Sequence, residues 1–261
     1  MTPRYNITII GAGNVGYHLS QLFFEAGHTI VDVFDRNIVN AEGAANTANA
    51  KPISNLAEIN YDADIFFLCV KDEMIGEIFS KLKAQNLIVV HTSGTTSIDV
   101  FKNFATSFGV FYPVQSFSKK IKTSLRNVTI GIDGNSDETK NTLWNLAESL
   151  QAKPILLNDD RRQVVHLAAV VANNFTNHLF VIAQNILEQE NLSFDLLKPL
   201  IETTVRKTDL NNPIELQTGP AMRNDISTME KQLSFLNEHP QWEEIYRLIS
   251  ESIQETKNLT K

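Results

Sequence analysis

Apolar residues in the first 157 positions form short runs rich in β-branched and aromatic side chains, and stretches with helical spacing separate them. Such runs predict strands, here at residues 5–10, 29–34, 65–70, 87–91, 110–112, 128–133 and 154–157. The runs ADIFFLCV and NLIVVH are apolar at consecutive positions. This is typical of central parallel strands that helices cover on both faces. The pattern predicts a doubly wound, mostly parallel α/β sheet.

From residue 158 onward the strand signals stop and helical patterns replace them. A stretch from Arg161 to about Glu190 holds neither Gly nor Pro and predicts one helix of roughly 45 Å. Further helices are expected at residues 194–207, 226–237 and 242–257. The chain is therefore predicted to have two domains, an α/β domain at 1–157 and an all-α domain at 158–261. A helix this long needs a covering surface, which predicts a homodimer formed through the helical domain.

Composition narrows the possible partners and the compartment. The chain has 261 residues and a net charge of −7, so nucleic acid is not an expected partner. The basic cluster Lys119, Lys120, Lys122 and Arg126 is interpreted as a solvated loop, with a site for a phosphate-bearing ligand as the weaker alternative. The single Cys69 lies in an apolar run and indicates a buried thiol in a reducing compartment. No leader pattern and no unbroken apolar run of about 18 residues is found, so we expect a cytoplasmic protein without a membrane partner.

A glycine-rich segment lies between the first predicted strand and the helix that follows it. In this context each glycine has a mechanical role: the first makes a tight turn, the second lets the backbone approach a pyrophosphate, and the third lets helix and strand pack closely. The helix N-terminus then faces an anion. The segment predicts a dinucleotide site formed by Gly11, Ala12, Gly13, Asn14, Val15 and Gly16.

An acidic residue and a basic residue follow the second predicted strand. Asp35 lies where an acidic residue binds the ribose hydroxyls of NAD. Arg36 follows it, and a guanidinium there can pair with the 2′-phosphate of NADP. A third interpretation is that Asp35 only caps the next helix. The sequence leaves NAD and NADP both open.

Several polar residues follow other strands of the predicted sheet. In an open α/β sheet the ligand lies outside the carboxyl ends of the strands, so these residues are candidates to surround a nicotinamide ring and a substrate. Val70, Ser93 and Gly94 are assigned to the cofactor, and Tyr112 and Gln115 to the substrate. His91 is a candidate proton donor, with a turn-binding role as the alternative.

His166 lies in the predicted long helix among apolar residues. At 100° per residue, Asn173 and Asn177 fall within about 20° of His166, so the three side chains form a polar stripe. We interpret His166 as the acid that protonates a substrate and an asparagine as the group that orients it. The alternative is a histidine and asparagines with structural hydrogen bonds.

The remaining polar residues support weaker hypotheses. Arg223 either pairs with Asp225, a predicted helix N-cap, or binds a substrate carboxylate. His18 and His28 are interpreted as surface or turn residues. No pair of Cys or His has metal-binding spacing, so no metal site is expected.

The segments GAGNVG, HTSGTTSIDVF, FYPVQSF, RQVVHLAAVVANN and LQTGPAMRND, in this order, together resemble a family of uncharacterised bacterial oxidoreductase-like proteins. Members pair a Rossmann-type NAD(P)-binding domain with a C-terminal helical domain of unknown function. They are similar to pyrroline-5-carboxylate reductase, deazaflavin-dependent NADP reductase and ketopantoate reductase. The resemblance implies NADP as cofactor, and it selects Asn174 rather than Asn173 beside His166.

The sequence departs from this family at three positions. It has Tyr112 where relatives have a histidine before proline, Asn224 where they have glycine, and Asp35 where they have Ser or Asn. The last departure favours NAD. We expect an NAD(P)-dependent reductase of a C=O or C=N bond in a small polar metabolite, bound between the two domains. The alternative is a dinucleotide-binding sensor or scaffold without redox turnover.

Overall fold

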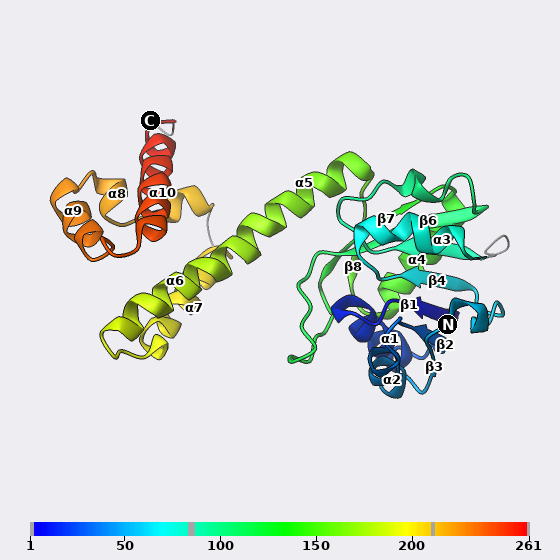
Figure 1. Cartoon of the computed structure of the whole chain (residues 1–261). Helices are drawn as coiled ribbons and strands as arrows, with labels where there is room; N and C mark the ends of the chain where they lie inside the picture. Colours follow the sequence, from blue (N-terminus) through cyan, green and yellow to red (C-terminus); the bar gives the residue numbers. More distant parts are fainter. Residues whose placement is uncertain (1–2, 83–86, 210–211, 260–261) are drawn as a thin grey trace. The chain divides into compact units, whose positions relative to one another are not determined.

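The computed structural model describes residues 3–82, 87–209 and 212–259 (Figure 1). Contacts divide the chain into two compact units, Met1–Asn174 and Phe175–Lys261. The last strand ends at Leu156, yet the first unit continues to Asn174, because the following helix packs against a loop of the sheet. The boundary expected at 157 therefore marks the change in secondary structure and not the edge of the first compact unit.

The first unit is built on one eight-stranded sheet with the order β3-β2-β1-β4-β5-β6-β7-β8. All neighbouring strands are parallel except β6 and β7. The strands are β1 Asn6–Ile10, β2 Thr29–Phe34, β3 Lys51–Ile53, β4 Ile65–Leu68, β5 Ile88–His91, β6 Ser107–Pro113, β7 Thr129–Gly134 and β8 Lys153–Leu156. The predicted mostly parallel α/β sheet is confirmed. Only the short edge strand β3 was not predicted, because three residues carry too little periodicity to be recognised.

Helices cover both faces of this sheet, as consecutive apolar strand positions require. One core contains Leu19 and Phe23 of α1 with Leu143 of α4, and the other contains Ile75 and Phe79 of α3. The helices of the first unit are α1 Asn14–Glu25, α2 Ile38–Asn46, α3 Ile75–Ser80, α4 Asp137–Ser149 and α5 Asp159–Ala169, with 3₁₀ turns at Leu56–Glu58, Asp72–Met74 and Ile98–Phe101. The two cores hold the strand ends in place, and the strand ends carry the candidate site.

The helix predicted from Arg161 to Glu190 is observed from Asp159 to Gln189, with one irregularity. Residues Val170–Phe175 form a π turn between α5 and α6, Thr176–Gln189. By length and composition alone this helix could cross a membrane, since it contains an 18-residue stretch that is mostly apolar and carries few charged side chains. The expectation of no membrane span considered only unbroken apolar runs. A stretch that is apolar on average but interrupted by polar residues was therefore not detected. One such helix is a weak indication, and only 6% of that stretch is buried.

The second unit is entirely helical in its described residues. It contains α6, α7 Lys198–Lys207, α8 Pro220–Arg223, α9 Ile226–Ser234 and α10 Pro240–Leu259, with 3₁₀ turns at Phe194–Leu197 and Pro213–Leu216. Helix α10 packs against α8. Asn224 adopts a left-handed conformation with φ of 55°, and Asp225 caps α9 by accepting a hydrogen bond from the Thr228 N–H. The all-α C-terminal region is confirmed.

Two histidines differ from their prediction as surface or turn residues. His18 is 2% exposed, and its Nε2 lies 2.9 Å from the carbonyl oxygen of Ser118. His28 is 4% exposed, and its two ring nitrogens bond with the Tyr5 N–H and the Ser149 hydroxyl. Both are therefore structural side chains that join distant segments. Sequence spacing could not reveal this, because their partners lie up to 121 residues away.

Candidate functional site

The glycine segment forms the turn between β1 and α1, and two of its glycines have no room for a side chain. Gly11 has φ of +101°, and a Cβ there would lie 2.6 Å from the Cys69 carbonyl oxygen. A Cβ on Gly16 would lie 1.8 Å from the Gly11 carbonyl oxygen. Gly13 instead faces open space, with no atom within 4 Å of the position that a Cβ would take. Helix α1 also lacks a side-chain N-cap, so its first N–H groups are free to bind an anion.

These features fit a dinucleotide pyrophosphate. The backbone at Gly13 is open to a ligand, while Gly11 and Gly16 set the turn and the helix packing. The residues that form this turn, and that would hold the pyrophosphate, are Gly11, Ala12, Gly13, Asn14, Val15 and Gly16.

Asp35 ties the glycine turn to the end of β2. Its Oδ2 accepts a hydrogen bond from the Ala12 N–H at 2.9 Å, and its Oδ1 accepts one from the Asn37 N–H at 2.9 Å. Asn37, and not Asp35, is the N-cap of α2, since it accepts a hydrogen bond from the Val39 N–H. Asp35 therefore has a structural role in addition to any contact with a ribose.

A cavity of about 220 Å³ opens beside this turn. Its lining carries the cations Arg36 and Lys71 together with the Asp35 carboxylate. The full lining is Gly11, Gly13, Phe34, Asp35, Arg36, Cys69, Val70, Lys71, Met74 and Ile78. Val70 and Arg36 were predicted to bind the cofactor. Lys71, which follows Val70 beyond the carboxyl end of β4, was expected only near the nicotinamide, and it lines the same cavity.

The loop after β5 is held by Asp72. Ser93 donates its hydroxyl hydrogen to Asp72 Oδ2 at 2.6 Å, and Thr95 donates to the same oxygen at 2.7 Å. The Ser93 oxygen also accepts hydrogen bonds from the N–H groups of Thr95 and Thr96. Ser93 was predicted to bind the cofactor, and its side chain is already used within the loop. This network fixes the loop at the carboxyl edge of the sheet.

His91 does not fit the predicted role of proton donor. It is fully buried, and its Nδ1 accepts a hydrogen bond from the Ser93 N–H at 3.2 Å. Burial, reinforced by the positive charge of Arg162, lowers the pKa of His91 to about 3. A histidine with this pKa is neutral at physiological pH and cannot supply a proton. The alternative interpretation, a histidine that bonds the turn, matches the geometry.

Helix α5 docks along the same loop through residues spaced three and four apart. Asp159 accepts a hydrogen bond from the Ile98 N–H at 3.2 Å. Arg162 is fully buried, and its Nη2 donates to the Thr96 carbonyl and to Asp159 Oδ1. One turn later His166 packs on Gly94, where a Cβ would lie 2.5 Å from His166 Nδ1. Asp159, Arg162 and His166, on successive turns of α5, therefore contact Ile98, Thr96 and Gly94 of the loop in turn.

His166 forms a pair with Tyr112 at the end of β6. The Tyr112 hydroxyl lies 3.0 Å from His166 Nδ1, and the rings meet edge to face. Tyr112 is 7% exposed, and burial raises its pKa, so the phenol is neutral. With Nδ1 engaged by Tyr112, Nε2 is the nitrogen left for a substrate. The prediction placed Tyr112 against the substrate and did not anticipate its bond to His166.

A cavity of about 440 Å³ lies beside this pair. It is lined by Tyr112, Val114, Gln115, Ser116, His166, Ala169, Val170, Ala172, Asn173 and Asn174. All of these residues belong to the first unit. The structure therefore brings together five predicted site residues: His166, Asn173, Asn174, Tyr112 and Gln115.

The π turn explains why both asparagines reach the cavity. A π turn bonds residue i to i+5, so it accommodates one extra residue. Asn173 and Asn174 lie within this turn, and both line the cavity, whereas Asn177, after the turn, does not. The stripe predicted from regular helical spacing included Asn177 and excluded Asn174. It was wrong on both, because the π turn cannot be read from periodicity.

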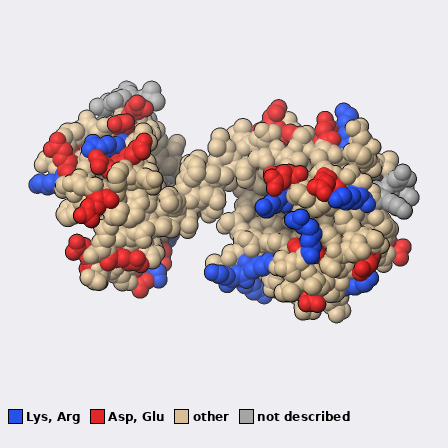
Figure 2. Space-filling view, viewed as in Figure 1, with Lys and Arg blue, Asp and Glu red and all other residues tan. Residues whose placement is uncertain are grey.

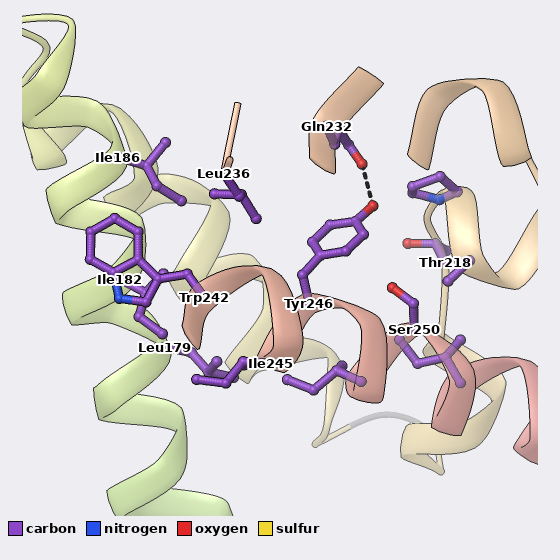
Figure 3. A pocket seen from close by; sticks show the side chains of 14 residues that line it. Leu179, Ile182, Ile186, Thr218, Gln232, Leu236, Trp242, Ile245, Tyr246 and Ser250 are labelled. Atoms are coloured by element: carbon purple, nitrogen blue, oxygen red, sulfur yellow. Dashed lines mark hydrogen bonds between the residues drawn. The ribbon is translucent and has the colours of Figure 1, made fainter. Parts of the chain in front are cut away.

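The second unit contains a different cavity, of about 300 Å³ and almost entirely apolar (Figure 3). Side chains of α6 and α10, including Ile182, Trp242 and Ile245, line it. The Tyr246 hydroxyl beside it donates to Gln232 at 2.6 Å.

Arg223, a predicted substrate ligand, is a residue at the end of α8 that lines neither this cavity nor the one beside His166. Figure 2 shows acidic side chains spread over the visible face of this unit. Basic side chains lie on both units, and one cluster of them lies on the loop after β6 of the first unit. No group of three metal-binding side chains occurs among the described residues.

Comparisons with known proteins give two family matches along the chain. Residues 6–94 match the family "NADP oxidoreductase coenzyme F420-dependent", and residues 128–253 match the domain of unknown function DUF2520. Among curated proteins, none has a sequence that matches the chain.

Three solved structures are similar over almost the whole chain. A "putative NADP oxidoreductase" from Bacteroides fragilis is 33% identical, with a TM-score of 0.91 over 97% of this chain and 98% of that one. A reductive aminase from Aspergillus terreus, in complex with NADPH and ethyl-5-oxohexanoate, has 13% identity and a TM-score of 0.73 over 97% and 93%. 1-Pyrroline-5-carboxylate reductase from Streptococcus pyogenes has 12% identity and a TM-score of 0.63 over 97% and 99%. The last two share the fold alone.

The family resemblance predicted from sequence is thereby confirmed, as is dependence on a nicotinamide dinucleotide. The chain belongs to the family of NADP oxidoreductases in which a Rossmann-type domain precedes a DUF2520 domain.

Proposed function

We propose that the protein reduces a C=O or C=N bond of a small polar metabolite with NAD(P)H, and that His166 supplies the proton. The observation that carries this proposal is the hydrogen bond between Tyr112 and His166 Nδ1, made at the wall of the 440 Å³ cavity. It leaves one imidazole nitrogen for a substrate. Histidine exchanges protons near neutral pH, as a general acid requires.

The chain's own contribution is to hold and move a proton. The bound cofactor supplies the hydride. In the imidazolium form, His166 donates its Nδ1–H to the Tyr112 oxygen, and the raised pKa of Tyr112 keeps that phenol neutral. Nε2 then gives its proton to the substrate oxygen or nitrogen, and His166 becomes neutral with Nδ1 still protonated. Asn173 and Asn174 line the same cavity and can orient the carbonyl or imine.

Replacement of His166 by Ala tests this role. We expect the variant to bind NADPH as the wild type does, while oxidation of NADPH by a panel of ketones, aldehydes and cyclic imines is abolished. His178→Ala is the matched control, because His178 is an exposed helical histidine outside the cavity. Unchanged turnover in His166→Ala would exclude His166 as the proton donor. Cofactor binding by the wild type without turnover on the whole panel would favour a sensor or scaffold instead.

We further propose NADPH as the preferred cofactor. Both carboxylate oxygens of Asp35 already accept backbone hydrogen bonds, while Arg36 and Lys71 line the adjacent cavity with two positive charges. A 2′-phosphate carries negative charge, and guanidinium and ammonium groups bind it well. These features support NADPH over NADH.

A homodimer through the helical region remains part of the proposal. Val164, Leu167, Val171 and Phe175 recur every three or four residues along the long helix, and each is more than half exposed. Contiguous exposed apolar surface of this kind marks an interaction site. A second copy of the chain is the partner we propose for it. Size-exclusion chromatography with light scattering should give the dimer mass, and Leu167→Glu should yield monomers.

A further inference from the structure

The cavity beside His166 differs from the cofactor cavity in its electrostatics. Apart from the titratable His166 and Tyr112, its lining contains only uncharged groups: the carboxamides of Gln115, Asn173 and Asn174, the Ser116 hydroxyl, and apolar side chains. The cavity beside the glycine turn instead carries Arg36, Lys71 and Asp35. The two cavities therefore suit ligand groups of different charge.

The carboxamides are available to a ligand. Among the described residues, the side chains of Asn173 and Asn174 have no hydrogen-bond partner, and both residues are exposed. The Gln115 Oε1 accepts a hydrogen bond from the Ser116 N–H at 2.9 Å, which leaves the amino group of Gln115 free. A carboxamide offers both donors and acceptors, so these groups can pair with a hydroxyl or with another carboxamide.

The buried guanidinium of Arg162, on α5, is not exposed to this cavity. Arg162 lies one turn before His166, but it is fully buried and absent from the lining. Its Nη2 bonds with Asp159 and the Thr96 carbonyl. Apart from His166, which in the proposed reaction gives its proton to the substrate, the lining contains no cationic group. A carboxylate in the cavity would therefore lose hydration without gaining a permanent cationic partner, which is unfavourable.

We propose that the substrate presents uncharged hydrogen-bonding groups, a hydroxyl or a carboxamide, within a few bonds of its carbonyl or imine, and no carboxylate. This inference rests on the proposed reductase function, since it concerns the same cavity. Gln115, Asn173 and Asn174 are then the residues that determine specificity.

A matched pair of compounds tests the inference. 4-Oxopentanamide and 4-oxopentanoate differ only in the uncharged or anionic end group. With NADPH and the wild-type protein, we expect kcat/KM for the amide to exceed that for the acid by about tenfold or more. An acid reduced as well as the amide, or better, overturns the inference.

Two lysine variants test whether the preference for the amide arises in this cavity. Asn174→Lys adds a cation to the lining, so the ratio of kcat/KM for acid over amide should rise about tenfold. Asn177→Lys adds the same charge three residues later on the same helix but outside the lining, and its ratio should stay at the wild-type value. Equal ratios in the two variants would contradict the assignment of the cavity.

A binding measurement separates this inference from the proposed chemistry. Saturation-transfer NMR with the protein loaded with NADP⁺ should detect 4-oxopentanamide more strongly than 4-oxopentanoate. If neither compound oxidises NADPH, the reductase function fails for these probes, and the binding preference still decides the question. Preferential binding of the acid, or binding of neither compound, overturns the inference.

Discussion

Gly94 lies directly under the imidazole of His166, so close that a Cβ at Gly94 would sit 2.5 Å from His166 Nδ1. Glycine is required here by the approach of a side chain from α5, and not by backbone conformation, since Gly94 has no positive φ. The catalytic hypothesis for His166 thus depends on a glycine in a loop that precedes it by 72 residues.

Gly94→Ala should lower kcat by about a hundredfold, because a displacement of the proton donor by about 1 Å costs on that order. The affinity for NADPH should change much less. Gly43→Ala is the control, because no atom lies within 4 Å of its Cβ position, and its kcat should equal that of the wild type. Steady-state kinetics with fluorescence titration of NADPH measures both quantities. A wild-type kcat in Gly94→Ala would contradict the close packing.

Tyr112→Phe should reduce kcat by about tenfold, since it removes the hydrogen bond that orients His166 and leaves the ring packing. The pH profile of kcat should shift as well, because the imidazolium loses its phenol acceptor. Tyr61→Phe, a tyrosine of the first unit outside the cavity, should change neither the rate nor the profile. An unaltered pH profile in Tyr112→Phe would show that Tyr112 only fills space.

Arg36→Ala and Lys71→Ala should each weaken NADPH binding by about tenfold or more while NADH binding changes by less than about threefold. The reason is that the two cofactors differ only in the 2′-phosphate, which these cations would pair with. Isothermal titration with both cofactors measures the preference. Asp35→Ser tests the opposing hypothesis: if Asp35 enforces NADH, this variant should gain affinity for NADPH.

His91 should make the folded protein less stable in mild acid. Its pKa is about 3 in the folded protein and 6.5 when exposed. Below pH 6.5 the unfolded chain therefore binds a proton that the folded chain excludes, and stability falls as the pH drops from about 6.5 toward 3. Between pH 7 and pH 5 the loss is on the order of 2 kcal/mol.

His91→Gln should remove this part of the pH dependence. Urea unfolding at pH 7 and pH 5 measures the free energy of unfolding for the wild type and the variant. Burial also lowers the pKa of His28, so His28 makes both proteins less stable at low pH. The difference between the two slopes of unfolding free energy against pH therefore reports His91 alone. Equal slopes would mean that His91 is protonated in the folded state.

The architecture was largely predictable from sequence, because the signals that specify it are local. Strands such as Ile65–Leu68 are apolar at every position, and the turn at Gly11 and Gly16 has a spacing that few other structures require. The short strand Lys51–Ile53 was not predicted, because three residues are too few to show the local pattern of a strand.

The site was only partly predictable. The sequence by itself determined an α/β sheet, a dinucleotide turn, a helical C-terminal region and a histidine in a long helix, because periodicity and glycine spacing act over a few residues. Only the tertiary structure decided which polar groups meet: it paired Tyr112 with His166, buried His91, and placed Asn174 on the cavity lining within a π turn. Such contacts join residues far apart in the chain, and their geometry depends on how helix and loop pack, which no local pattern records.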